Sequence, residues 1–140
     1  MRGASFVDTN LWIYAHLRAP DDPRHDLALA FVKSLKGGVI SPQVVAEYYN
    51  VMLRNGKEDT WIQANLTAIF GYTRLQPIDV SVVRRALTIR NRYGFSYWDC
   101  QIVAAAMESG CETLYTEDLQ QGQIIGGVLT VINPLLPQPA

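Results

Sequence analysis

Two carboxylates lie just after short apolar segments that have the character of buried strands. Asp8 ends the apolar pair of "FVDTN", and Asp118 follows Leu114 and Tyr115 in "LYTED". In an open parallel sheet, ligands bind beyond the carboxyl ends of the strands. Both acids are therefore expected at that edge of a sheet. Glu117 could substitute or assist, but neighbours on a strand point to opposite faces, so only one of the two would face a shared site.

Two further acids lie in segments with helical periodicity. In "FSYWDCQIVAAAMESG", Ile102, Val103 and Ala106 follow Asp99 by three, four and seven residues, so the acid shares the apolar face of its helix. Glu47, in "SPQVVAEYYNVM", lies at the border of the apolar stripe of its helix. Asp99 is expected to face inward, and Glu47 to lie at the rim of the same region.

Each acid also has a purely structural interpretation. Asp8 can cap the helix that follows it, and Asp99 can pair with Ser96 in a capping box. Asp118 can be a turn residue, and Glu47 a solvated side chain at a helix border.

If the four acids converge, their mutual repulsion has to be offset, and a divalent cation is the usual means. Carboxylate and water ligands without His or Cys suit Mg²⁺ or Mn²⁺ rather than zinc. Such ions activate water and stabilise a leaving oxygen in phosphodiester hydrolysis. The expected chemistry is therefore metal-dependent phosphoryl transfer.

The elements that must position these acids alternate along the chain as in an α/β domain with a parallel sheet covered on both faces. Helices are delimited by Gly37 and Gly38 as a stop, by Ser41 as an N-cap before Pro42, and by Gly110 as a stop. The predicted strands are residues 5–7, 39–40, 113–115 and 130–132, with a weaker one at 75–78. The predicted helices are residues 11–17, 25–36, 43–54, 60–72, 82–93 and 97–109.

Four segments resemble, in order and approximate spacing, the PIN-domain nucleases, and in particular the VapC-type toxins of toxin–antitoxin pairs. The segments are "FVDTNLWIYA", "SPQVVAEYYNVM", "YGFSYWDCQIVAAAMESGC" and "LYTEDLQQGQIIGGVLTVINP", and the similarity covers residues 6–134. The resemblance implies a three-layer α/β/α fold. The family's metal-binding acids match Asp8, Glu47, Asp99 and Asp118, and its polar residue after the first Asp matches Thr9.

The same resemblance implies an endoribonuclease that depends on Mg²⁺ or Mn²⁺. It also implies a homodimer, and an antitoxin protein that inhibits by docking over or near the site. These expectations come from the resemblance alone, and neither periodicity nor composition supplies them.

An RNA substrate also needs cationic contacts, and the stretch 74–92 is basic. Arg84, Arg85 and Arg92 share the polar face of their helix, which makes them candidate phosphate contacts, although a solvated helix face is the more common reason for such a pattern. Aromatic side chains are interpreted as core or dimer contacts rather than base-stacking platforms; these are Trp12, Trp61, Trp98, Tyr48 and Tyr49.

Two other classes of protein are open alternatives. A non-catalytic α/β binding module would use the four acids as caps and rim residues. A phosphatase or receiver domain would use Asp8 as a phosphate-accepting nucleophile, but a phosphatase requires a second Asp where this chain has Asn10. Nucleotide-binding glycine motifs are missing from the sequence.

Composition fits one domain over residues 1–140, with 49% hydrophobic and 18% charged residues. No apolar run approaches the roughly 20 residues of a membrane span, so a cytoplasmic protein is expected. Cys100 and Cys111 are expected to be reduced core residues. The net charge of −1 provides no general attraction for nucleic acid, so binding would need a local basic patch or a cation. The proline-rich residues 133–140 are expected to run extended.

Overall fold

A six-stranded sheet forms the centre of the computed structural model, which describes residues 4–137. The strand order is β3-β2-β1-β4-β6-β5. All neighbouring strands are parallel except β5 and β6, which are antiparallel. The strands are β1 (Ser5–Val7), β2 (Val39–Ile40), β3 (Arg74–Leu75), β4 (Thr113–Tyr115), β5 (Ile124–Ile125) and β6 (Leu129–Ile132).

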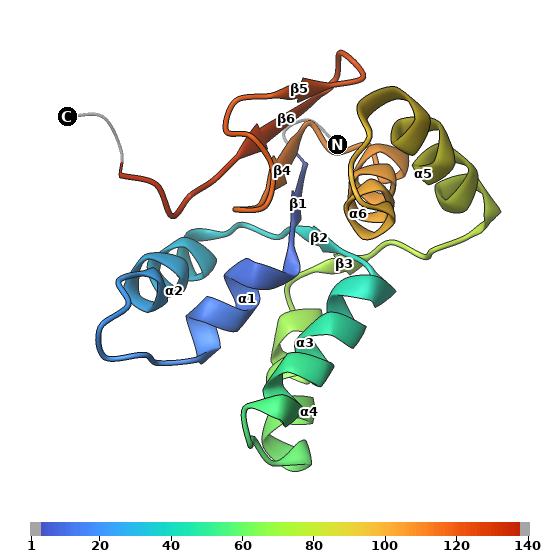
Figure 1. Ribbon diagram of the computed structural model, residues 1–140. Helices are drawn as coiled ribbons and strands as arrows, with labels where there is room; N and C mark the ends of the chain where they lie inside the picture. Colours follow the sequence, from blue (N-terminus) through green and yellow to red (C-terminus); the bar gives the residue numbers. More distant parts are fainter. Residues whose placement is uncertain (1–3, 138–140) are drawn as a thin grey trace.

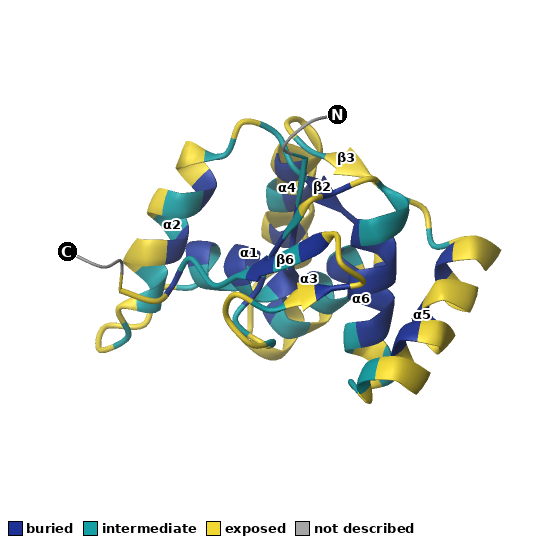
Figure 2. Cartoon of the chain, turned by 90° about the horizontal axis from the view of Figure 1, so that it is seen from above, coloured by how far each residue is buried: buried dark blue, intermediate teal, exposed yellow. Residues whose placement is uncertain are grey.

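Helices flank this sheet on both sides, as the sequence predicts. The pair α1 and α2 lies on one side and the pair α5 and α6 on the other, and α3 and α4 pack together below (Figure 1). The view from above shows the same three-layer order (Figure 2). The six helices are α1 (Thr9–His16), α2 (Arg24–Ser34), α3 (Pro42–Arg54), α4 (Asp59–Phe70), α5 (Val80–Tyr93) and α6 (Tyr97–Glu108).

The core lies between the sheet and these helices. Phe6 and Leu114 on neighbouring central strands are fully buried, because β1 and β4 are covered on both faces. Helix α6 is buried almost all round, and small residues at its centre allow the sheet and α5 to approach closely. Cys100 and Cys111 are both buried and free, which confirms that they are reduced core residues.

Several helix boundaries differ from the sequence prediction by up to two residues. Helix α1 begins at Thr9 rather than residue 11, because Asp8 caps it, and α5 begins at Val80, because Asp79 accepts from Val82 N. Pro42 occupies the first turn of α3 as expected. The Ser41 hydroxyl, however, makes no capping bond and, within residues 4–137, is buried without a partner.

The edges of the sheet also depart from the prediction. Strand β3 is only Arg74–Leu75, because Pro77 has no N–H to continue the ladder beyond Gln76. The two-residue strand β5 was not expected. Its turn into β6 uses Gly126 and Gly127, whose φ angles of 59° and 73° favour glycine, so the "GG" pair was the signal for a hairpin.

The chain after β6 turns instead of running extended. Asn133 Oδ1 accepts a hydrogen bond from the backbone N–H of Leu135 at 2.9 Å, which closes a turn. The expectation of an extended segment is therefore wrong at its start, and its last three positions, 138–140, lie outside the described residues. Among the described helices, none has the length and apolar character that crossing a membrane requires.

Candidate active site

Asp8 lies at the carboxyl end of β1 with only 5% of its surface exposed. Its Oδ1 accepts from the backbone N–H of Thr9 at 2.7 Å, and its Oδ2 accepts from the hydroxyl of Thr116 at 2.8 Å. The capping interpretation is thus correct for one oxygen. The second oxygen is bonded by Thr116, which directly follows β4. Residues from two different parts of the chain therefore hold the carboxylate in place.

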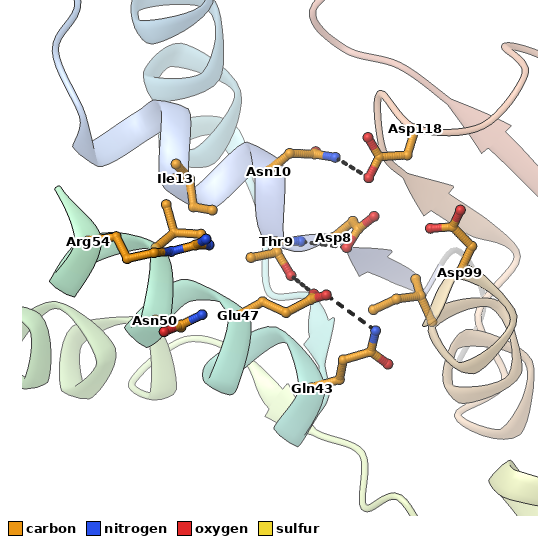
Figure 3. Close-up of a pocket in the computed structure, with 12 residues that line it drawn as sticks. Asp8, Thr9, Asn10, Ile13, Gln43, Glu47, Asn50, Arg54, Asp99 and Asp118 are labelled. Atoms are coloured by element: carbon orange, nitrogen blue, oxygen red, sulfur yellow. Dashed lines mark hydrogen bonds between the residues drawn. The ribbon is translucent and has the colours of Figure 1, made fainter. Parts of the chain in front are cut away.

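The four predicted acids line one pocket of about 390 Å³. They arrive from separate elements: Asp8 from the end of β1, Glu47 from α3, Asp99 from α6 and Asp118 from the loop after β4 (Figure 3). Parallel strand order brings these elements to one edge of the sheet. The remaining lining is supplied by Thr9, Asn10, Ile13, Gln43, Asn50, Val51, Arg54 and Ile102.

Glu47 is oriented by two neighbours. The Thr9 hydroxyl donates to its Oε1 at 2.6 Å, and the Gln43 amide lies one helical turn away with Nε2 at 3.5 Å from Oε2. Thr9, the predicted polar residue after the first acid, therefore positions a carboxylate of a different element (Figure 3). Glu47 is half-buried at the pocket wall rather than solvated on the helix rim.

Asp118 and Asp99 occupy the opposite side of the pocket. The Asn10 amide donates to Asp118 Oδ2 at 3.0 Å, and the Asp118 backbone N–H donates to the Thr116 hydroxyl at 3.0 Å. Asp99 stands in the first turn of α6, where its backbone N–H donates to Ser96 Oγ at 3.2 Å. Only the backbone of Asp99 takes part in this cap, so its carboxylate is available to the pocket.

The electrostatics of the pocket disfavour negative charge. Burial raises the pKa of Asp8 to about 7, although hydrogen bonds from Thr116 and Thr9 lower it, and the carboxylates of Asp118 and Glu47 raise it further. Asp118 lies at the exposed rim, yet partial burial of its carboxyl group raises its pKa, and so does repulsion from Asp99 and Glu117. A bound cation would favour the charged forms of both Asp8 and Asp118.

Glu117 points away from this pocket. Its carboxylate accepts a hydrogen bond from the Tyr14 hydroxyl, and the Arg24 guanidinium lies 3.5 Å from it. Arg24 also stacks over the Tyr14 ring, 4.2 Å from its centroid, and pairs with Asp22. Glu117 thus joins the loop after β4 to α1 and α2, and only Asp118 of the two neighbours lines the pocket.

The predicted phosphate contacts lie elsewhere. Arg84, Arg85 and Arg92 are on α5 and do not line the pocket, and Arg85 pairs with Glu108 at 2.8 Å. The cation on the pocket wall is Arg54, in the last turn of α3, which the sequence reasoning missed. Arg54 follows Glu47 by seven residues, two turns along the same face of the helix, and this spacing could have indicated that both side chains reach the same pocket.

The donor set suits a hard divalent ion, since it consists of carboxylates with hydroxyl and amide neighbours. Within residues 4–137, however, no three His, Cys, Asp or Glu side chains are arranged closely enough to hold one metal ion together. The chemistry of the residues therefore fits such an ion, while direct ligation by three or more of them would require the side chains to adjust.

Comparison with solved structures finds the same fold in several proteins. One is VapC20 from Mycobacterium tuberculosis, a sarcin–ricin loop cleaving toxin, with 19% identity, a TM-score of 0.67 and coverage of 82% of this chain and 92% of that one. Another is a toxin–antitoxin complex from Klebsiella pneumoniae, with 20% identity, a TM-score of 0.71 and coverage of 94% and 97%. A third is VapBC2 from Rickettsia felis, bound to a DNA fragment from its promoter, with 18% identity, a TM-score of 0.64 and coverage of 93% and 99%.

Curated protein sequences give no significant match to the chain. The profile of the PIN domain family, in contrast, matches residues 5–125, which include β1, the four pocket acids and β5. This match confirms the resemblance seen in the sequence, and the fold shared with the solved structures above agrees with it. The chain belongs to the PIN domain family.

Proposed function

We propose that the protein is a metal-dependent endoribonuclease and the toxin component of a toxin–antitoxin pair. The observation that carries the proposal is the convergence of Asp8, Glu47, Asp99 and Asp118 on one pocket from four elements. Membership of the PIN domain family and the structural likeness to toxins, one of which cleaves the sarcin–ricin loop, support the same function.

In this proposal Asp8, Glu47, Asp99 and Asp118 would hold Mg²⁺ or Mn²⁺ after their side chains adjust around the ion. When bound, such an ion activates a water molecule and stabilises the leaving oxygen of a phosphodiester. Thr9 keeps Glu47 in place through its 2.6 Å hydrogen bond, and Asn10 does the same for Asp118. Arg54 supplies the positive charge that binds an RNA phosphate at the pocket wall.

The central test is cleavage of a panel of small structured RNAs with added Mg²⁺ or Mn²⁺ and with chelator. Wild type should cut only with metal, and Asp8→Asn and Asp99→Asn should lose cleavage while keeping the wild-type circular dichroism spectrum. Each change removes one charge but little volume. Undiminished cleavage by a nuclease-free preparation of Asp99→Asn would contradict the assignment.

The proposal includes a homodimer, a cognate antitoxin protein and a location in the cytoplasm. Toxin–antitoxin complexes of the same fold support the antitoxin partner, and the two free cysteines suit a reducing compartment. Sedimentation at micromolar concentration should give the mass of a dimer. A monomer that co-purifies with no product of its native operon would count against the toxin role, but not against the nuclease.

A further inference from the structure

Trp98 presents a large aromatic surface beside the proposed catalytic pocket. It lies in the first turn of α6, directly before Asp99, and is 62% exposed. An indole usually contributes most to the stability of a protein when it is buried. Of the two roles that the sequence indicated for Trp98, a core residue or a dimer contact, the core role is therefore wrong. Trp98 lines a second pocket, of about 450 Å³, whose other walls are Gln43, Ala46, Glu47, Asn50 and Gln101.

The two pockets are adjacent. Gln43, Glu47 and Asn50 line both of them, so the second pocket borders the wall that carries Glu47, one of the four acids; these three residues are labelled in Figure 3. Lysine and arginine are missing from the residues that line the second pocket, whereas Arg54 lines the first. A phosphate is therefore better accommodated in the acid pocket, with metal and Arg54, and an uncharged group in the pocket of Trp98.

The backbone that carries Trp98 is held firmly. Gln43, only 6% exposed, donates through Nε2 to the carbonyl oxygen of Trp98 at 3.0 Å and accepts from Gln101 Nε2 at 2.9 Å. The Tyr97 hydroxyl donates to Gln101 Oε1 at 3.0 Å, and its ring meets Trp98 edge-on with centroids 5.7 Å apart. This buried amide bridge joins α3 to α6, so the exposed indole stands on a preorganised support.

We propose that this second pocket binds an unpaired nucleobase of the RNA, adjacent to the phosphate that is cut, by stacking it on Trp98. The inference rests on the nuclease function proposed above and adds a subsite to it. Nucleobases have flat apolar faces and polar edges, and aromatic side chains bind them without a need for charge. The Asn50 amide has no hydrogen-bond partner among the described residues, so its donor and acceptor are available to the edge of the base.

The test measures cleavage of a short single-stranded RNA and of the same RNA with an abasic ribose next to the cut. Trp98→Ala should weaken apparent RNA affinity by about 5- to 150-fold on the intact RNA, the range expected for one stacked base. On the abasic RNA, Trp98→Ala and wild type should perform alike. Trp98→Phe, which keeps a ring, should restore most of the loss. Trp61→Ala, a change at another partly exposed tryptophan, on α4 and outside both pockets, is the matched control.

Asn50→Ala provides a second readout that a purely structural role would not change. It should alter which nucleotide is preferred beside the cut, measured as a change in the ratio of kcat/KM values between RNAs that differ only at that nucleotide. Equal activity of wild type and Trp98→Ala on the intact RNA overturns the inference but leaves the nuclease function intact. A loss that persists on the abasic RNA would show that Trp98 does not act through that base, and a loss that accompanies a change in sedimentation mass would assign Trp98 to a protein interface. Either result overturns the inference. If wild type cuts no RNA with metal, the proposed function fails, and this subsite with it.

Discussion

The Thr116 hydroxyl donates a 2.8 Å hydrogen bond to Asp8 Oδ2 across the ends of two neighbouring strands. Thr116 is fully buried, and its oxygen also receives the backbone N–H of Asp118 at 3.0 Å. One hydroxyl thus connects two of the four pocket acids. Its bond to Asp8 stabilises the charged form of that carboxylate.

Thr116→Val should therefore raise the pKa of Asp8 further, because the hydrogen bond that lowers it is removed. Metal binding requires the carboxylate, so the acidic limb of the pH–rate profile should move to higher pH. The change should also cost about 1–3 kcal/mol of stability, since buried partners lose a hydrogen bond. The profile is measured from pH 5 to 9 at saturating Mn²⁺. An unshifted acidic limb would show that Thr116 does not tune Asp8.

Neutralising Asp99 should stabilise the metal-free protein. The charge of Asp99 repels Asp118, and its carboxylate makes no capping bond, so Asp99→Asn relieves repulsion without removing the cap. The thermal midpoint of Asp99→Asn should exceed that of wild type by about 3 °C in chelator. Millimolar Mn²⁺ should reverse the order, because ion binding stabilises wild type more. A variant that is less stable in chelator, with neither protein responding to Mn²⁺, would make Asp99 a helix cap only.

Metal-free stability should fall as pH rises towards neutrality. The pKa of Asp8 is about 7 in the folded protein against 3.8 as its ordinary value, so the folded state binds this proton more tightly. The resulting stabilisation is fully present below about pH 4 and is lost as pH rises through 7. Urea unfolding in chelator should give a lower free energy of unfolding at pH 8 than at pH 5, and Asp8→Asn should flatten the difference. If the free energy of unfolding of Asp8→Asn falls equally between pH 5 and pH 8, groups other than Asp8 cause the pH dependence.

Arg54, rather than the arginines of α5, should contact the RNA phosphate nearest the pocket. Arg54→Gln should weaken binding of all RNA sequences alike and reduce the salt dependence of binding, with the slope of log K against log salt changing by about 0.7. Arg84→Gln is the matched control, because it removes the same charge from α5. If only Arg84→Gln changes the slope, the candidate contacts on α5 are the correct ones.

The neighbours Asp118 and Glu117 should differ sharply in their effect on cleavage. Asp118→Asn should abolish metal-dependent cutting, since its carboxylate lines the pocket. Glu117→Gln should retain most of it and instead lower thermal stability modestly, because the contacts with Tyr14 and Arg24 weaken. Loss of cleavage in Glu117→Gln at wild-type stability would return Glu117 to the site.

Local patterns in the sequence indicated Asp8, Asp99, Asp118 and most of the elements that carry the four acids, whereas Glu47 was assigned through the family resemblance. Asp8 follows an apolar strand, and Asp99 lies on an apolar helix face, and both properties depend only on neighbouring residues. Strand Ser5–Val7 agrees with the prediction for the same reason. Strand β5 is too short for periodicity to register, and the end of β3 depends on a single proline.

Tertiary structure decided the features that depend on contacts between distant segments. The hydrogen bond from Thr116 to Asp8 spans 108 positions of the chain, and that from Thr9 to Glu47 spans 38. The direction of the chain after β4 determines that Asp118, and not Glu117, lines the pocket. The exposure of Trp98 depends on how α6 packs against α3. Periodicity describes the faces of one element, whereas a pocket is made where several elements meet, and only their packing determines which side chains share it.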